Sequence, residues 1–335
     1  MGCKDELQGS CTGKLQTPSK DELQGARTHE LQGSRKHELQ GSLLILVASV
    51  FFGLAGTAAR KLFVTGTASP VVVVECRLAS SFVILLLVLS LVAPQHIRIR
   101  REHLRYFLIY GIVGMGCVQL SFYTALSQGS VSTAIFLQYL APVFSAVYFS
   151  VAQRRLPEGD LLLSIVVATT GLVFLLLGGG GMSTTPLGFV SGIMSAGFLS
   201  FYTIYGAIGL KTYAPQTMLL WSCGFASLFL MTLKPPWTIL RAGLQTKDWL
   251  YIGFIAIFGT LIPMLILLQG IKRVPALRAI LVMTLEPVLA TAFAWLLLSE
   301  SLNLLQAAGG TLIIVAVVAL QARRAMLARL PSGTY

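Results

Sequence analysis

From Ser42 onward, apolar runs of about 20 residues alternate with short polar breaks. A helix needs about 20 apolar residues to cross the roughly 30 Å hydrocarbon layer of a bilayer. Backbone polar groups in lipid must be satisfied within their own segment, and a barrel would show alternating hydrophobicity, so these runs predict membrane-spanning helices. Ten runs fit, at approximately 43–62, 70–92, 104–126, 131–151, 161–178, 187–209, 216–233, 249–270, 276–298 and 302–321.

Composition supports the same class of protein. The chain has 335 residues, of which 55% are hydrophobic and 11% charged, and its mean hydropathy is +0.77. Charged residues make up about a quarter of an ordinary soluble domain, so a soluble enzyme is excluded. The spans leave too little chain for a separate extramembrane domain. We therefore predict an all-α polytopic membrane protein whose function is performed inside the bilayer.

The first 42 residues differ from the rest. They repeat a polar phrase four times, beginning at Lys4, Lys20, His29 and His37, with Glu-Leu-Gln-Gly in each copy. A low-complexity polar tract cannot bury a core, which predicts a disordered tail over 1–42. A first five-helix repeat is expected over 43–181, and a second five-helix repeat with a short cytoplasmic tail over 182–335.

The formal net charge of +12 belongs to residues 43–335, because basic and acidic residues are equal in number in the tail. If the N-terminus is inside, the inner loops and C-terminal tail carry twelve Lys and Arg residues and the outer loops carry five. This distribution predicts cytoplasmic termini. The charge excess is mainly a topology signal, so no nucleic-acid partner is predicted.

The chain contains an internal duplication. An offset of 145 residues superposes landmarks of spans 2, 3 and 4 on those of spans 7, 8 and 9. The matches are Pro70 with Pro215, Tyr106 with Tyr251, Gly114 with Gly259, Ala134-Ile135 with Ala279-Ile280, and Leu140 and Pro142-Val143 with Leu285 and Pro287-Val288. Each half has an odd number of spans, so the halves must be inverted, as in many secondary transporters.

Several stretches together resemble the EamA-type family of the drug/metabolite transporter superfamily. They are Leu137-Gln-Tyr-Leu-Ala-Pro-Val-Phe144, Gly259-Thr260, Leu285–Glu300, Gln306–Ile314, Pro235-Pro-Trp237 and Arg77. The resemblance covers about residues 43–322 and is most specific in spans 9 and 10. It implies a ten-helix, five-plus-five inverted repeat in which helices 1–4 and 6–9 surround a cavity and helices 5 and 10 are peripheral. The sequence departs from the family at Arg155, the repeat counterpart of Glu300, where the family often has an acidic residue.

Charged residues within the spans are the first candidates for the substrate site, because each costs about 2.5–3.5 kcal/mol at the centre of a spanning helix. Glu286 is predicted near mid-bilayer, followed by the helix-kinking Pro287. It is expected to be protonated, to pair with a cation or to meet substrate, unless it is only a structural cap. Arg77 is the expected partner for Glu286 or for a substrate carboxylate. Glu75 is expected to snorkel to the outer interface, and Arg278 to anchor at the inner one.

Uncharged polar residues complete the candidate cavity. They lie on helices that the resemblance places around the cavity: Gln119, Tyr123, Gln138, Tyr139, Tyr202 and Tyr205. Ordinary interhelical hydrogen bonding is the alternative for each of them. All four histidines lie outside the spans and the cysteines have no paired spacing, so no catalytic residue, metal site or cofactor is predicted.

The predicted function is secondary transport by alternating access, most simply export of small metabolites or amino acids across the cell (inner) membrane, by analogy with the family. Proton coupling through Glu286 and facilitated exchange both remain open. A membrane-embedded enzyme acting on a lipid-linked substrate is the alternative, disfavoured because no span contains Asp or His. A channel would usually show a filter segment. The sequence leaves substrate, direction and oligomeric state undetermined.

Overall fold

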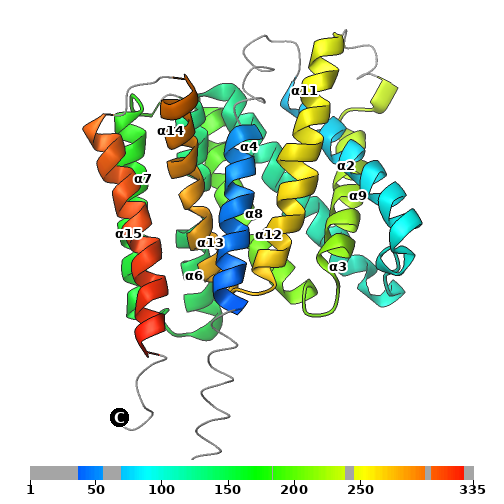
Figure 1. Cartoon of the computed structure of the whole chain (residues 1–335). Coiled ribbons are helices and arrows are strands. Elements are labelled where there is room, and N and C mark those ends of the chain that lie inside the picture. Colours follow the sequence, from blue (N-terminus) through cyan, green and yellow to red (C-terminus); the bar gives the residue numbers. More distant parts are fainter. Residues whose placement is uncertain (1–36, 56–68, 183, 238–244, 299–302, 328–335) are drawn as a thin grey trace, which may run out of the picture.

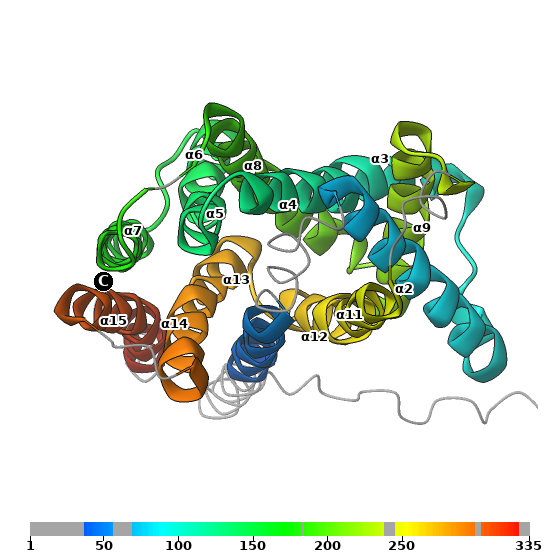
Figure 2. The same cartoon turned by 90° about the horizontal axis from the view of Figure 1, so that it is seen from above.

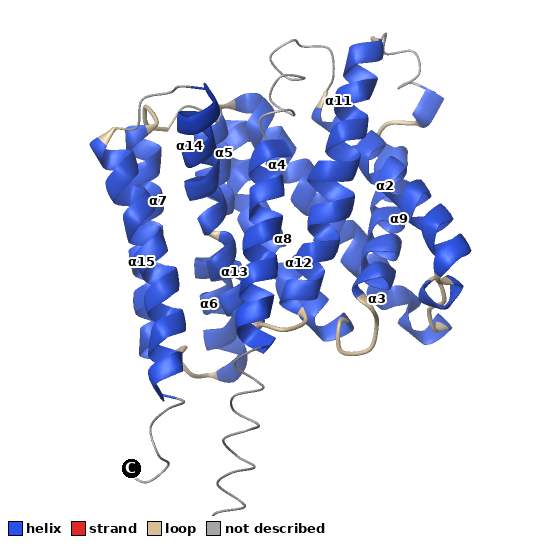
Figure 3. Ribbon diagram, viewed as in Figure 1, coloured by secondary structure: helices blue, strands red, loops and turns tan. Residues whose placement is uncertain are grey.

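The computed structural model describes residues 37–55, 69–182, 184–237, 245–298 and 303–327. Within these ranges every regular element is a helix, apart from one isolated bridge between Gly129 and Thr184 (Figure 3). The tail predicted over 1–42 lies mostly outside the described ranges. Its last six residues, 37–42, are helical, because the first helix extends beyond the apolar run by a polar turn.

The helices follow the predicted spans in order. They are His37–Ala55, α2 (Pro70–Val92), α3 (Leu104–Ile109) continuing through the π-helix η3 (Tyr110–Cys117) into α4 (Val118–Gln128), α5 (Val131–Gln138) with α6 (Ala141–Gln153), α7 (Gly159–Gly178), α8 (Pro186–Gly209), α9 (Pro215–Leu233), α11 (Thr246–Ala256) continuing through the π-helix η4 (Ile257–Leu261) into α12 (Ile262–Ile271), α13 (Ala276–Met283) with α14 (Leu285–Leu298), and α15 (Leu304–Leu327). Short 3₁₀ turns, η1 (Pro94–His96) and η2 (Arg101–His103), connect α2 to α3.

Eight of the described helical segments are long and apolar enough to cross a membrane. The other two predicted spans are α13–α14, which is interrupted in the middle, and α15, whose apolar part is Leu304–Leu320. The protein is therefore an all-α multi-pass membrane protein built as a five-plus-five inverted repeat. The first span begins at His37 and not at residue 43.

The two halves share their irregularities as well as their helices. The π-helix η3 in span 3 recurs as η4 in span 8, and the offset of 145 residues places η4 within the counterpart of η3. The fourth span breaks at Tyr139–Leu140, and the ninth breaks at Thr284, which is the counterpart of Tyr139. Deviations from a regular helix recur at matching positions, so the duplication extends to backbone geometry.

Proline explains both breaks. Pro142 and Pro287 lack an N–H, so the carbonyl oxygens of Gln138 and Met283 lose their usual partners four residues on. The chain tightens there, with Leu140 N–H bonding to Leu137 O at 3.3 Å and Thr284 N–H bonding to Leu281 O at 3.1 Å. Each of these spans is consequently two helices joined near mid-membrane.

Helices α7 and α15 stand side by side at one end of the molecule (Figure 1). Their contact depends on two glycines, because a Cβ at Gly171 would lie 2.6 Å from Gly309 O and a Cβ at Gly309 would lie 2.6 Å from Gly171 O. The remaining helices form two rows, with α4, α5 and α8 facing α12, α13 and the first helix (Figure 2). The position of α7 and α15 at one end of the molecule agrees with the peripheral position that the resemblance implied for helices 5 and 10.

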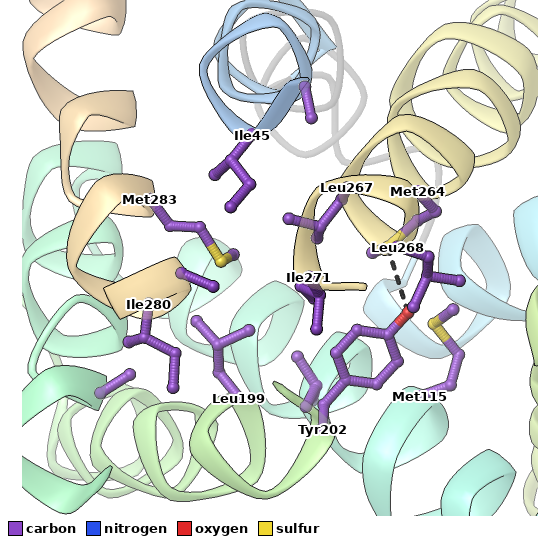
Figure 4. Packing of buried hydrophobic residues seen from close by; sticks show 14 of the residues in the cluster. Ile45, Met115, Leu199, Tyr202, Met264, Leu267, Leu268, Ile271, Ile280 and Met283 are labelled. Carbon is purple, nitrogen blue, oxygen red and sulfur yellow. Dashed lines mark hydrogen bonds between the residues drawn. The ribbon is translucent and has the colours of Figure 1, made fainter. Parts of the chain in front are cut away.

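We call the face where the first helix begins and α15 ends the terminal face, and the other the opposite face (Figure 1). Apolar side chains from both rows meet in a layer. It contains Ile45, Met115, Leu199, Tyr202, Met264, Leu268, Ile271 and Met283, and each is at most 7% exposed (Figure 4). These side chains are buried where the two rows meet.

Candidate functional site

The breaks of spans 4 and 9 meet each other through a hydrogen bond. Tyr139, at the first break, donates from its hydroxyl to Oε2 of Glu286, two residues beyond the second break. Both side chains are buried, Tyr139 at 1% exposure and Glu286 at 8%. Glu286 lies ten residues after the start of α13 (Ala276), or roughly 15 Å along the helix, so it is near mid-membrane.

Arg77 forms a second buried polar cluster, between α2, α4 and η4. Its Nε donates to Thr260 Oγ1 at 2.9 Å, Nη1 donates to the hydroxyl of Tyr123, and Nη2 donates to Gly259 O at 3.3 Å. The guanidinium also lies over the Tyr123 ring, 4.8 Å from its centroid. Gly259 and Thr260 belong to the π-helix, where the wider turn displaces carbonyl groups from the regular hydrogen-bond ladder.

The expected pairing of Arg77 with Glu286 is therefore wrong. Each of the two residues has neutral hydrogen-bond partners, on different helices. Sequence reasoning missed Thr260, although Gly259-Thr260 was one of the stretches that carried the resemblance. A polar residue beside a glycine in the middle of a span was the available signal.

Tyr202 and Tyr205 join an aromatic stack between α8 and span 3. Tyr202 stacks on Tyr110 with ring centroids 4.9 Å apart, and Tyr205 stacks on Tyr106 at 4.5 Å. The Tyr202 hydroxyl faces Met264 Sδ at 3.7 Å (Figure 4). Tyr202 thus belongs to the apolar layer, and Tyr205 belongs to the same aromatic stack.

The two glutamines are buried near these clusters. Gln119 is 5% exposed and its Nε2 faces Met115 Sδ in its own span at 3.8 Å. Gln138 is 9% exposed and is the last residue of α5 before the break. Of the eight candidate residues, the structure brings Arg77 together with Tyr123, and Tyr139 together with Glu286.

Two further charged residues differ from expectation. Glu75 is 2% exposed, so it does not snorkel to the surface, because α9 and α11 pack against α2 there. Arg278 is 9% exposed and forms an ion pair with Glu38 of the first helix, with Nη1 and Oε2 3.2 Å apart. It therefore joins the first helix to α13. The pair was not predicted because Glu38 was expected to lie in the disordered tail.

The terminal face carries a cleft of about 580 Å³. The start of the first helix, the end of α8 and the loop between α12 and α13 line it, with Glu38, Lys211, Lys272 and Arg273 among its charged residues. Ile271 belongs both to this cleft and to the apolar layer of Figure 4. The cleft therefore borders the apolar layer.

Comparison with known proteins agrees with this architecture. The model of the EamA-like transporter family matches residues 39–177 and 186–321. An uncharacterized inner membrane transporter, YicL from Salmonella typhimurium, is 26% identical over 289 residues, covering 84% of this chain and 95% of the relative. The threonine/homoserine exporter RhtA from Escherichia coli is 26% identical over 268 residues, covering 79% and 84%.

One solved crystal structure superposes with a TM-score of 0.65 at 17% identity, covering 88% of this chain and 99% of the other, and shows the fold alone. The two family matches fall on the two halves of the described architecture and together span most of the chain. The chain belongs to the EamA-like transporter family, and it is a membrane transporter and not an enzyme.

Proposed function

We propose that this transporter exports small metabolites or amino acids across the inner membrane by alternating access, with both termini cytoplasmic. The observation that carries the proposal is the meeting of the two helix breaks at Tyr139 and Glu286. In inverted-repeat transporters, substrate sites are typically formed by discontinuous helices near the midplane, between the repeats. Here both discontinuous spans are among those that the resemblance places around the cavity, and they touch at their breaks.

We infer that the apolar layer closes the path from the terminal face. Its side chains are buried, and it borders the terminal-face cleft at Ile271. Rocking one row of helices against the other would part this layer and expose the same polar residues to the cytoplasm. The relatives support the rest: RhtA is named an exporter of threonine and homoserine, and YicL an inner membrane transporter.

The substrate site is proposed around Glu286, Tyr139, Gln138, Gln119, Tyr123 and Arg77, with Tyr202 and Tyr205 forming its inner closure. Glu286 has a hydroxyl partner and, among the described residues, no basic one within 4.0 Å. A carboxyl group in such surroundings can be neutralised by a proton at little structural cost, since a hydroxyl can rotate to accept as well as donate. Glu286 is therefore our proposed proton carrier.

The test is solute uptake by the purified full-length protein in liposomes, using a labelled panel of amino acids, sugars, nucleosides and polyamines, with and without a pH gradient. We expect saturable counterflow of at least one solute, with protein-free liposomes as the control. Saturation and counterflow distinguish a carrier from a channel. No counterflow of any panel member, with lipid modified instead, would contradict the proposal.

A further inference from the structure

Among the described residues, the positive charge of Arg77 is buried without a counter-ion. Arg77 is 2% exposed, and its three hydrogen bonds go to two hydroxyl groups and one backbone carbonyl. Among the described residues, no carboxylate lies within 4.0 Å of its guanidinium. Buried charges in proteins are normally paired, because neutral acceptors compensate only part of the lost hydration.

The carboxylates of the neighbouring spans do not supply the missing partner. Glu286 is bonded to Tyr139 on the other broken span. Glu75 is two positions from Arg77 on the same helix, and residues two apart do not face each other.

The duplication provides an internal control for whether packing requires an arginine here. The counterpart of Arg77, 145 residues on, is Ser222 in α9. Around Arg77, α2 of the first half packs on α11 and η4 of the second half. The counterpart of α2 is α9, and it packs on η3, the counterpart of η4. Ser222 bonds within its own helix, to Leu219 O at 3.0 Å. The same helix contact therefore forms at the counterpart site without a charge.

The guanidinium also retains unused donors. It has five N–H groups, and three have acceptors. The terminal nitrogens Nη1 and Nη2 each use one of their two hydrogens, and the bond from Nη2 to Gly259 O, at 3.3 Å, is the longest of the three. A guanidinium fork with free terminal donors matches the two oxygens of a carboxylate.

We propose that Arg77 is the residue that binds the carboxylate of the transported solute, with Tyr123 and Thr260 holding the guanidinium in place. This inference rests on the proposed transport function and adds the chemical class of the solute. Binding would replace the long contact to Gly259 O by a charge-assisted pair.

The experiment compares matched solutes that differ at the carboxylate. In liposomes containing the full-length protein, counterflow of the best-carried labelled amino acid, beginning with L-threonine, is inhibited by the unlabelled acid or by its amide, such as L-threoninamide. We expect the amide to inhibit at least tenfold more weakly than the acid. In R77S, which installs the residue of the counterpart site, that difference should disappear. R77K should keep part of it, because lysine retains the charge but not the fork.

Ser81 provides the matched control. Its Oγ donates to Ala256 O at 3.0 Å in the same α2–α11 contact, so S81A removes a hydrogen bond there without removing a charge. S81A should keep the discrimination between acid and amide. Size-exclusion chromatography shows whether R77S is folded. If it is not, the ratio of inhibition by the acid to inhibition by the amide in the unsubstituted protein still decides whether the carboxylate of the solute is recognised.

Three results would overturn the inference: equal inhibition by acid and amide, discrimination that survives in R77S, or a protein that carries only solutes without a carboxylate. In the last case the transport proposal stands while the assignment of Arg77 fails. If the unsubstituted protein carries no solute at all, the transport proposal itself fails, and this inference with it.

Discussion

At the residue level, Tyr139 and Glu286 show how one hydrogen bond can join two halves of a transporter. The two residues are 147 positions apart, and each belongs to a different repeat. Neither has its own kind at its counterpart position, where Thr284 and Ala141 stand. The two breaks are therefore similar in backbone geometry but chemically unequal.

Glu286→Gln should abolish accumulation driven by a pH gradient but preserve solute exchange. The amide keeps the size of the side chain and can still accept a hydrogen bond from Tyr139, but it cannot carry a proton. Accumulation and counterflow measured in the same liposome preparation separate the two activities. Tyr139→Phe is the matched control, since it removes the partner and keeps the carboxyl group. Undiminished accumulation by Glu286→Gln would remove Glu286 from proton transfer.

The ion pair between Arg278 and Glu38 should stabilise the terminal face by about 1 kcal/mol, because the pair is partly buried, with side-chain exposures of 11% and 29%. The measurement is a double-mutant cycle on thermal unfolding in detergent, using Arg278→Gln, Glu38→Gln and the double variant. We expect the stability losses of the two single variants to add up to more than the loss in the double variant. Strictly additive effects would show that the pair contributes nothing.

At the level of the elements, the interruptions in spans 4 and 9 have a local cause and a distant consequence. Pro142 and Pro287 break the helices, and this much is readable in the sequence. Which residues the two breaks then touch depends on how the helices rotate about their axes and pack. The π-helices follow the same rule: glycines at 111, 114, 116 and 259 permit them, but the approach of Arg77 to Gly259 O and Thr260 is a tertiary contact.

Gly171→Ala should destabilise the contact between α7 and α15 by about 1–3 kcal/mol, the usual cost of overpacking a tight interface. A Cβ at this position would meet backbone and side-chain atoms of α15, namely Gly309 O at 2.6 Å and Ile313 Cγ1 at 2.8 Å. The matched control is Gly253→Ala in α11, where a Cβ would have no neighbour within 4 Å. Thermal unfolding in detergent should shift for the first variant only. Equal shifts would contradict the close packing of the two helices.

At the level of the whole molecule, the odd number of spans in each half dictates the inversion. The second half starts on the face opposite to the first, so α3 and its repeat counterpart α11 begin on opposite faces of the molecule (Figure 1). The basic residues of the loops predict which side is cytoplasmic. This orientation is still a prediction.

Labelling of single cysteines with a membrane-impermeant maleimide tests the orientation. In a background with the native cysteines replaced, Gly159→Cys, at the start of α7, should react only when the cytoplasmic side is accessible. Thr246→Cys, at the start of α11, should react in intact cells. Both positions are exposed in the structure. The reverse pattern would place the termini outside.

The sequence alone determined the class, the number of spans and the inverted duplication, because hydropathy and backbone hydrogen bonding inside lipid act within each segment. It also singled out Arg77 and Glu286, since a charge in a span is costly wherever it points. Their partners were decided only by the tertiary structure. The contacts of Arg77 with Thr260 and of Arg278 with Glu38 join residues 183 and 240 positions apart. Such contacts depend on the rotation and close packing of whole helices, which no local pattern of residues specifies.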